Sequence, residues 1–266
     1  MAVYKLSNSG VTTKRSYSSF SAGNLAPVPP LYANSVVSSG LIFHLDAANT
    51  SSYSGSGSTW TDLTGNKNAT LISSPTYETI NTHGFLTFNG TSQYGTIAFS
   101  GSPFRQTSAI TYDVWVKVAS GGGGYVAGTS VSGGQGTGGF GVFTDSAMFT
   151  WTPSSPQSDR SFSNSSPVSF ENTWKHVCMT FNYSTNTKAL YINGSSVAMT
   201  DSGSWTTATP NTSSYNLSQV DSVGGRFVNS QGYFKGSIAA IKVYNTALSS
   251  SDVTTNFNAL KQRFGL

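Results

Sequence analysis

Few side chains of this chain could carry out acid–base or nucleophilic chemistry. The 266 residues include ten acidic residues, three histidines and one cysteine. Retaining glycoside hydrolysis requires two carboxyl groups about 5–5.5 Å apart. The two glutamates, Glu78 and Glu171, lie far apart in the sequence and in turn-rich stretches. The sequence therefore predicts a protein that is not an enzyme.

His176 and Cys178 are a closely spaced pair of a base and a nucleophile, because residues two apart lie on the same face of a strand. No G-x-S-x-G sequence accompanies the histidines, so a serine hydrolase is not indicated. Ordinary packing of a small buried cysteine is the preferred interpretation. A single cysteine also excludes an internal disulfide and a C-x-x-C metal site.

The segment 134–139 satisfies the G-x-G-x-x-G spacing of dinucleotide-binding loops. Such a loop needs a following helix whose N-terminus meets the pyrophosphate. Here the next residues, 140–143, are typical of a strand. The glycines are therefore interpreted as a loop between strands, and nucleotide binding is not predicted.

The composition is that of a β protein with many turns. Only 9% of the residues are charged, against roughly 25% in typical soluble domains. Lys5, Lys14 and Arg15 give residues 1–35 a net charge of +3, which leaves +1 of the total of +4 for the rest of the chain. A body this neutral is not expected to bind nucleic acid.

Residues 1–35 are predicted to form an extended arm and linker ahead of one domain over residues 36–266. The prolines in the stretch 26–30 favour extended backbone and prevent regular sheet pairing. The polar residues before them have too little apolar surface to fold alone. No run has the apolar core of a signal peptide or the length of a membrane span. We therefore expect synthesis in a cytoplasm without a cleaved signal, and no membrane insertion.

Strand patterns recur at short intervals after the arm. The stretches 110–118 and 177–183 alternate with a period of two, which predicts one buried face for each. Asn-Gly at 89–90 and at 193–194 predicts tight hairpin turns. One-sided burial with hairpins is typical of two antiparallel sheets packed face to face. Further strands are predicted at 41–45, 85–88, 190–192, 197–199 and 236–244.

One helix is predicted near the C-terminus. The serines at 249–251 precede Asp252, which is the pattern of a capping box. Val253, Phe257 and Leu260 then follow at helical spacing and form one apolar stripe. We expect this helix to lie across an edge of the sandwich or to contact the arm.

Eight short motifs occur in register across residues 40–250, nearly the whole of the predicted domain. They are 40–47 (Gly-Leu-Ile-Phe-His-Leu-Asp-Ala), 60–66, 88–94, 115–117, 174–177, 190–194, 234–238 and 243–249. In this order they resemble laminin-G-like jelly-roll domains, a branch of the concanavalin A-like lectin/glucanase fold. The resemblance implies an all-β, two-sheet antiparallel jelly-roll sandwich, here with an extended N-terminal arm and one short C-terminal helix.

The resemblance raises two chemical expectations. Glucanases of this fold carry their carboxylates as E-x-D-x-x-E, a sequence that is missing here. Many laminin-G relatives hold one calcium ion, for which Asp46, Asp62 and Asn66 lie nearest the matching motifs and Asp221 could join from a later loop. Calcium prefers six to eight oxygen ligands, and no D-x-D-x-D loop is present. Asp62 and Asn66 are instead predicted to cap the turn 63–65. No cofactor is predicted, with one structural calcium ion left open.

Two further stretches resemble virus proteins. The ending 256–266 is similar to the ends of such domains in marine tailed phages, and the stretch 4–24 is similar to N-termini of structural proteins of cyanophage-like viruses. This implies a structural virion protein in the capsid or an appendage, present in many copies or as a homo-oligomer. Its arm would bind other virion proteins by charge and aromatic burial. The arm residues expected to do so are Lys14, Arg15, Tyr17 and Phe20.

A lectin-like fold also implies carbohydrate binding. Sugars need aromatic platforms for their apolar faces and polar groups for their hydroxyls. The candidate glycan platform is Trp151, Trp205, Tyr215 and Tyr233, all in polar, loop-like stretches. The alternative role of each is to close an end of the sandwich or a subunit contact. Two functions stay open: a virion protein that displays this domain toward host or environmental glycans, and a free carbohydrate-binding lectin.

Overall fold

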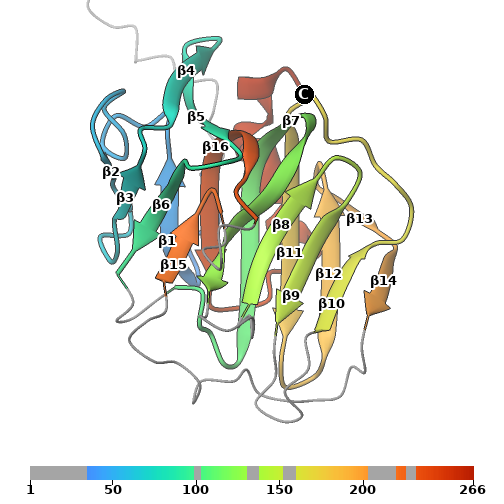
Figure 1. Ribbon diagram of the computed structural model, residues 1–266. Coiled ribbons are helices and arrows are strands. Elements are labelled where there is room, and N and C mark those ends of the chain that lie inside the picture. The colour runs from blue at the N-terminus through green and yellow to red at the C-terminus, as the bar shows by residue number, and fades with distance from the viewer. Residues whose placement is uncertain (1–34, 99–102, 131–137, 152–159, 203–219, 226–231) are drawn as a thin grey trace, which may run out of the picture. The chain divides into compact units, whose positions relative to one another are not determined.

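The computed structural model describes residues 35–98, 103–130, 138–151, 160–202, 220–225 and 232–266 (Figure 1). The compact unit that contains them comprises residues 34–266. Its strands are β1 (Leu41–Asp46), β2 (Thr59–Trp60), β3 (Ala69–Ile72), β4 (Thr76–Ile80), β5 (His83–Asn89), β6 (Tyr94–Ile97), β7 (Ala109–Ser130), β8 (Gly138–Phe143), β9 (Ala147–Trp151), β10 (Arg160–Asn164), β11 (Lys175–Asn182), β12 (Thr187–Ile192), β13 (Ser195–Val197), β14 (Met199–Ser202), β15 (Val220–Val223) and β16 (Lys235–Tyr244). The helix α1 (Ser250–Leu260) and the 3-10 helix η1 (Lys261–Phe264) follow.

Strand β7 is long enough to take part in two sheets. Its first half pairs with β11 and β16, and its second half pairs with β8 and β15. One sheet runs β13–β12–β11–β7–β16, with β1 and β5 both beside β16 and β4 beside β5. The other runs β14–β10–β9–β8–β7–β15–β6–β3–β2. All these pairings are antiparallel and the sheets lie face to face (Figure 1), which confirms the predicted sandwich.

The side chains between the two sheets form the main apolar core. Tyr112 and Val114 of β7 are buried there with Val177 and Met179 of β11, so both predicted alternations are confirmed. Across the layers, the ring centroid of Tyr112 lies 5.7 Å from that of Phe140 in β8. Each such fully buried side chain contributes about 1.5–3 kcal/mol to the free energy of unfolding. The core therefore holds the two sheets together.

The hairpin turn predicted at 193–194 is confirmed, because β12 and β13 pair on either side of it. The hairpin predicted at 89–90 was wrong: β5 pairs with β4 and β16, whereas β6 pairs with β3 and β15, so this turn leads from one sheet to the other. Residues 140–143 belong to β8, as expected after the glycine-rich segment, of which residues 131–137 lie outside the described part. The expectation that Glu78 lies in a turn was wrong, because the β-branched and aromatic residues around it form strand β4 in a regular hairpin with β5.

Helix α1 begins with the predicted capping box. Ser249 Oγ accepts a hydrogen bond from Asp252 N, and Asp252 Oδ2 accepts one from Ser249 N. The helix does not lie at an edge of the sandwich, as had been expected, but packs on the outer face of the sheet that contains β16, β7 and β11. Neither this helix nor any other in the described ranges is long and apolar enough to cross a bilayer.

The helix covers this face because the sheet is apolar on its outer side as well. Trp115 of β7 stacks on Phe257 and Phe264, with ring centroids 5.9 and 4.3 Å apart. The ring of Trp174 lies 4.7 Å from that of Phe264. Both tryptophans are buried. The C-terminal segment thus forms a third layer, which the alternation of β7 alone does not predict.

Four polar side chains meet in a fully buried cluster beneath helix α1. Asp113 Oδ2 accepts hydrogen bonds from His176 Nε2 (3.0 Å) and Asn256 Nδ2 (2.9 Å). Asp113 Oδ1 accepts a hydrogen bond from Lys242 Nζ. Burial acts to raise the pKa of Asp113, but Lys242 and His176 outweigh it and hold this pKa well below its usual range. One carboxylate therefore joins β7, β11, β16 and α1.

His44 of β1 lies opposite Lys242 in the pairing of β1 with β16. Burial, together with the positive charge of Lys242, lowers the pKa of His44 from 6.5 to about 4. Between pH 6.5 and about 4, the imidazole of His44 is therefore neutral in the folded protein but protonated in the unfolded chain.

We predict that Asp113→Asn lowers the free energy of unfolding by about 3–5 kcal/mol, because it leaves the ammonium group of Lys242 buried without a counter-charge. The double variant Asp113→Asn with Lys242→Met should recover a large part of this loss, since no unpaired charge remains. Urea unfolding of both variants measures the effect. A loss below about 1 kcal/mol in the single variant would show that the ion pair is not buried as described.

We predict that stability falls as the pH drops from about 6.5 to about 4, in part through His44. In this window the unfolded state binds a proton that the folded state does not bind, so the free energy of unfolding decreases with decreasing pH. The contribution approaches roughly 3 kcal/mol, from about 1.4 kcal/mol per pKa unit. His44→Gln should flatten this part of the stability curve, measured by urea unfolding at several pH values. An unchanged slope would contradict the neutral, buried imidazole.

Candidate functional site

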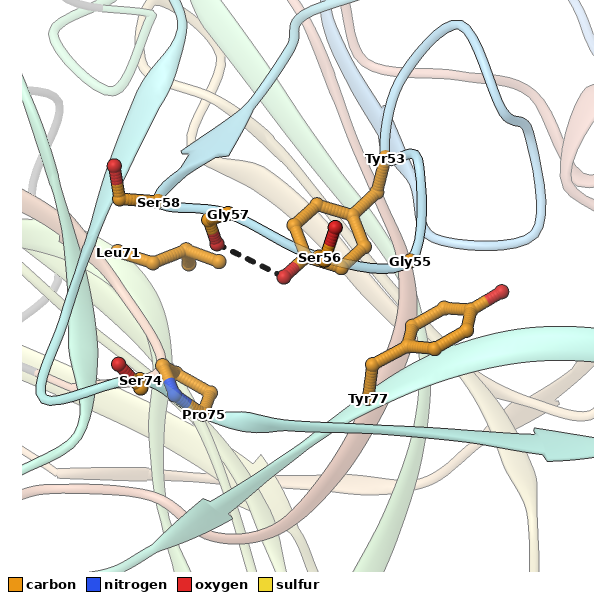
Figure 2. A pocket seen from close by; sticks show the side chains of 9 residues that line it. All are labelled: Tyr53, Gly55, Ser56, Gly57, Ser58, Leu71, Ser74, Pro75 and Tyr77. Carbon is orange, nitrogen blue, oxygen red and sulfur yellow. Dashed lines mark hydrogen bonds between the residues drawn. The ribbon is translucent and has the colours of Figure 1, made fainter.

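A pocket of about 450 Å³ opens between the loop from β1 to β2 and the turn from β3 to β4. This volume lies within the range of small-molecule sites, roughly 300–1,000 Å³. Figure 2 shows Leu71 and Pro75 on the opposite side of the pocket from Tyr77. The lining residues are Tyr53, Gly55, Ser56, Gly57, Ser58, Leu71, Ser74, Pro75 and Tyr77.

Tyr53 is fixed by its own loop. Its Oη donates a hydrogen bond of 3.0 Å to Gly57 O, shown dashed in Figure 2. Gly57 has a φ of 95°, a conformation that residues with a side chain rarely adopt. Glycine at this position therefore lets the loop turn back to the phenol. Because only 4% of Tyr53 is exposed, this ring forms the inner wall of the pocket.

Tyr77 of β4 supplies the accessible aromatic surface. It is half-buried, and its ring centroid lies 5.5 Å from that of Tyr53, with the two planes inclined by 47°. The far end of Tyr77 lies against Gly84 of β5. A Cβ atom at Gly84 would lie 2.3 Å from Tyr77 Oη and 2.5 Å from Ala47 O. Glycine at 84 therefore allows the ring of Tyr77 to occupy this position.

The turn from β3 to β4 presents Ser74 to the pocket. Ser73 and Ser74 both have positive φ angles, 57° and 49°. Gln93 Nε2 donates hydrogen bonds to Ser73 O (3.2 Å) and Ser74 O (2.9 Å). Such conformations cost on the order of 1–3 kcal/mol each and cluster at functional sites. The loop before β6 thus holds a strained turn at the rim of the pocket.

The pocket combines aromatic rings with hydroxyl groups, and none of its lining residues carries a charge. Ser56, Ser58 and Ser74 are exposed, and their hydroxyls can each donate and accept hydrogen bonds. Burial, with a smaller effect of Tyr77, raises the pKa of Tyr53, so this phenol stays neutral near neutral pH. The surface suits an uncharged ligand that has an apolar face and several hydroxyl groups.

The glycan platform predicted from the sequence is described only in part. Trp205 and Tyr215 lie outside the described residues, and so does the side chain of Trp151, whose backbone ends β9. Tyr233 is half-buried, with its ring centroid 5.7 Å from that of Tyr94, and it does not line the pocket. The arm residues Lys14, Arg15, Tyr17 and Phe20 also lie outside the described part of the chain.

Sequence reasoning missed Tyr53 and Tyr77. The available signal was the Ser-Gly run at 54–58, a flexible loop directly after a tyrosine. No local pattern places Tyr77 beside this loop. Their proximity depends on two strand pairings, the hairpin of β4 with β5 and the pairing of β5 with β16. Strands β5 and β16 lie far apart in the sequence.

Asp62, a candidate calcium ligand, caps a turn as predicted. Its carboxylate accepts hydrogen bonds from the backbone N–H groups of residues 44, 64, 66 and 67. Asn66 Nδ2 donates to Thr64 Oγ1 and to Ile42 O in the same turn. The local hydrogen bonds therefore fix this loop against β1.

The other candidate calcium ligands are engaged in ion pairs. Arg263 Nη1 lies 2.9 and 2.8 Å from the two carboxylate oxygens of Asp46. Asp221 Oδ1 accepts hydrogen bonds from Arg105 Nη2 (3.1 Å) and Thr129 Oγ1 (2.7 Å). Within the described ranges, no group of three or more His, Cys, Asp or Glu side chains is placed to hold a metal ion.

The residues considered for catalysis also have structural partners. His176 bonds Asp113, while burial, reinforced by Asp113, raises the pKa of the Cys178 thiol and disfavours the reactive thiolate. The interpretation of these two residues as packed strand residues is confirmed. Glu78 Oε2 accepts a hydrogen bond from Thr87 Oγ1, and Glu171 Oε1 accepts one from the backbone N–H of residue 121.

The two-sheet antiparallel sandwich is a concanavalin A-like, lectin-like fold. The model of the concanavalin A-like lectin/glucanases superfamily matches residues 89–254, more than half of the chain. The chain belongs to this superfamily, as its sequence motifs implied. No curated protein sequence matches it.

Solved structures share the fold. The binding domain of botulinum neurotoxin serotype D/C is 14% identical, with a TM-score of 0.56 over 83% of this chain and 52% of that chain. Botulinum neurotoxin type C, whose cell entry depends on interaction with two ganglioside molecules, is 15% identical with a TM-score of 0.55, over 83% and 51%. Trypanosoma rangeli sialidase in complex with 2,3-difluorosialic acid is 16% identical with a TM-score of 0.53, over 85% and 34%. These likenesses show the fold alone, and the chain spans about half or a third of these proteins.

Proposed function

We propose that this protein is a non-catalytic carbohydrate-binding domain that binds sugars in the pocket between Tyr53 and Tyr77. The observation that carries the proposal is the combination, in one pocket, of an accessible tyrosine ring with three exposed serines. Membership of a superfamily of lectins and glucanases supports it.

The ring of Tyr77 matches the apolar C–H face of a sugar. Aromatic side chains bury large apolar areas at little cost in conformational entropy, because they have few rotatable bonds. Ser56, Ser58 and Ser74 line the same pocket, and each hydroxyl can exchange hydrogen bonds with a sugar hydroxyl. The loop and turn that carry them are held by Tyr53 and Gln93. The pocket is therefore largely formed before a ligand arrives, which limits the entropic cost of binding.

A non-catalytic role is supported by the positions of four acidic residues. Most glycoside hydrolases flank the scissile bond with a pair of Asp or Glu side chains. In the described part of the chain, Asp46, Asp113 and Asp221 are buried in ion pairs, and Asp62 caps a turn. None of the residues that line the pocket is acidic. The pocket can thus hold a sugar but offers no group to cleave it.

We predict that Tyr77→Ala weakens sugar binding by roughly tenfold or more, because it removes the stacking surface, worth about 1.4 kcal/mol. A glycan array on residues 36–266 identifies a ligand, and isothermal titration calorimetry measures its affinity for each variant. Tyr233→Ala is the matched control, since Tyr233 is also half-buried but lies outside the pocket. Loss of binding with Tyr233→Ala and not with Tyr77→Ala would indicate that sugars bind at the platform predicted from the sequence and not in this pocket.

We further propose that residues 1–35 attach this domain to a virus particle in many copies. Support comes from the sequence: the arm is basic, ends in a proline-rich linker and has aromatic residues suited to burial in a partner, among them Tyr17 and Phe20. Lys14 and Arg15 supply charge for an acidic partner surface. A free lectin with an incidental arm is the alternative.

Deletion of residues 1–30 tests this attachment. The truncated protein should fold and bind sugars as before, because the pocket and core begin after residue 40. It should no longer enter particles when it is produced together with the other virion proteins. Incorporation at the level of the full chain would contradict the role of the arm, whereas failure of the full chain itself to enter particles would favour the free lectin.

A further inference from the structure

We propose that the pocket selects uncharged sugars and excludes sugars that carry a carboxylate, sulfate or phosphate group. This inference rests on the carbohydrate-binding function proposed above and names the class of ligand. The fold does not settle that class, because the likeness to solved structures at 14–16% identity shows the fold alone.

No cation lines the pocket. Its nine lining residues are tyrosines, serines, glycines, one leucine and one proline. Proteins recognise carboxylates and sulfates chiefly with Arg or Lys, which replace the water that the anion loses. An anionic group that enters this pocket would give up hydration without a counter-charge, which is strongly unfavourable.

The cationic side chains with known contacts are committed elsewhere. Those in ion pairs are Arg105, Lys188, Lys242 and Arg263, whose partners are Asp221, Asp201, Asp113 and Asp46. Lys117 and Lys261 lie over the rings of Phe85 and Phe257. Movement of any of these six toward the pocket would break an existing contact, so a small rearrangement of them does not supply the missing charge.

Backbone carbonyl groups add to this preference. Ser56 O, Gly57 O and Ser74 O each accept one hydrogen bond from the chain itself, from Ser54 Oγ, Tyr53 Oη and Gln93 Nε2. A carbonyl oxygen has a second lone pair, which can accept a hydrogen bond from a sugar hydroxyl. The same lone pairs repel an anion. The rim therefore favours hydroxyl donors over acidic groups.

The experiment compares sugars that differ only in an acidic group. The pairs are galactose with galacturonic acid and glucose with glucuronic acid, titrated against the full chain by calorimetry or ligand-observed NMR. The neutral member of the pair that binds should bind at least about tenfold more tightly. Its affinity should change little with ionic strength, because no charge takes part.

A designed gain of charge sharpens the test. Ser56→Lys places a cation at the exposed rim and should increase the affinity for the acidic sugar severalfold, in a salt-dependent manner, while the neutral sugar, which loses the Ser56 hydroxyl and gains no charge partner, should bind no more tightly than before. Ser54→Lys is the matched control, because Ser54 is exposed in the same loop but does not line the pocket. It should leave both affinities unchanged.

The outcomes separate the two proposals. Equal or tighter binding of the acidic sugars by the wild-type chain, sensitive to Tyr77→Ala, would overturn the selection for uncharged sugars but uphold the sugar site. An equal gain of affinity for the acidic sugar in the Ser54→Lys and Ser56→Lys variants would also count against the proposed selection. The charge of the sugar would then not be recognised in the pocket. Absence of binding for every sugar would overturn the proposed function and this inference together.

Discussion

Asp113 lies in the first half of β7, on the face that helix α1 covers, and its carboxylate accepts hydrogen bonds from three other elements. Lys242 of β16 and His176 of β11 flank it in the sheet, and Asn256 reaches it from the helix. Asn256 also donates to Tyr244 Oη and accepts from Val37 N, so the segment before β1 joins the same network. A buried charge tolerates few arrangements of its partners, because each lost hydrogen bond leaves an unpaired polar group. The network therefore specifies how the C-terminal segment docks, beyond what apolar packing requires.

The pocket is connected to strand β7 and its buried network only through the pairing of strands. Tyr77 stands on β4, which pairs with β5, and β5 pairs with β16 next to β7. Ser74 follows β3, which pairs with β6, and β6 pairs with β15 beside the second half of β7. The two sides of the pocket thus belong to different sheets. Because β7 is shared by both sheets, it sets the spacing between them and hence the distance across the pocket.

The sequence predicts the inner layer of the fold, between the two sheets, better than the outer layer between one sheet and helix α1. The alternation in β7 and β11 reveals the inner face, because apolar side chains at every second position leave little choice of orientation. The same strands carry Asp113 and His176 at the intervening positions, which would normally indicate a solvent-facing side. Only the helix makes that side buried, and the contact of Asn256 with Asp113 joins residues 143 positions apart in the sequence. The pocket escapes prediction for the same reason, since Tyr53 and Tyr77 are brought together by pairings that no local pattern encodes.

The family match begins at residue 89, whereas every residue that lines the pocket lies between positions 53 and 77. The part of the chain that makes this protein a member of its superfamily is thus not the part that would contact a ligand. The loop 54–58 and the turn 73–75 lie between strands, so they can change without disturbing β7 or the buried carboxylate. The scaffold is in this sense permissive to exchange: a different loop and a different turn at these positions, with β2, β3 and β4 kept in the sheets, would give the same sandwich another specificity.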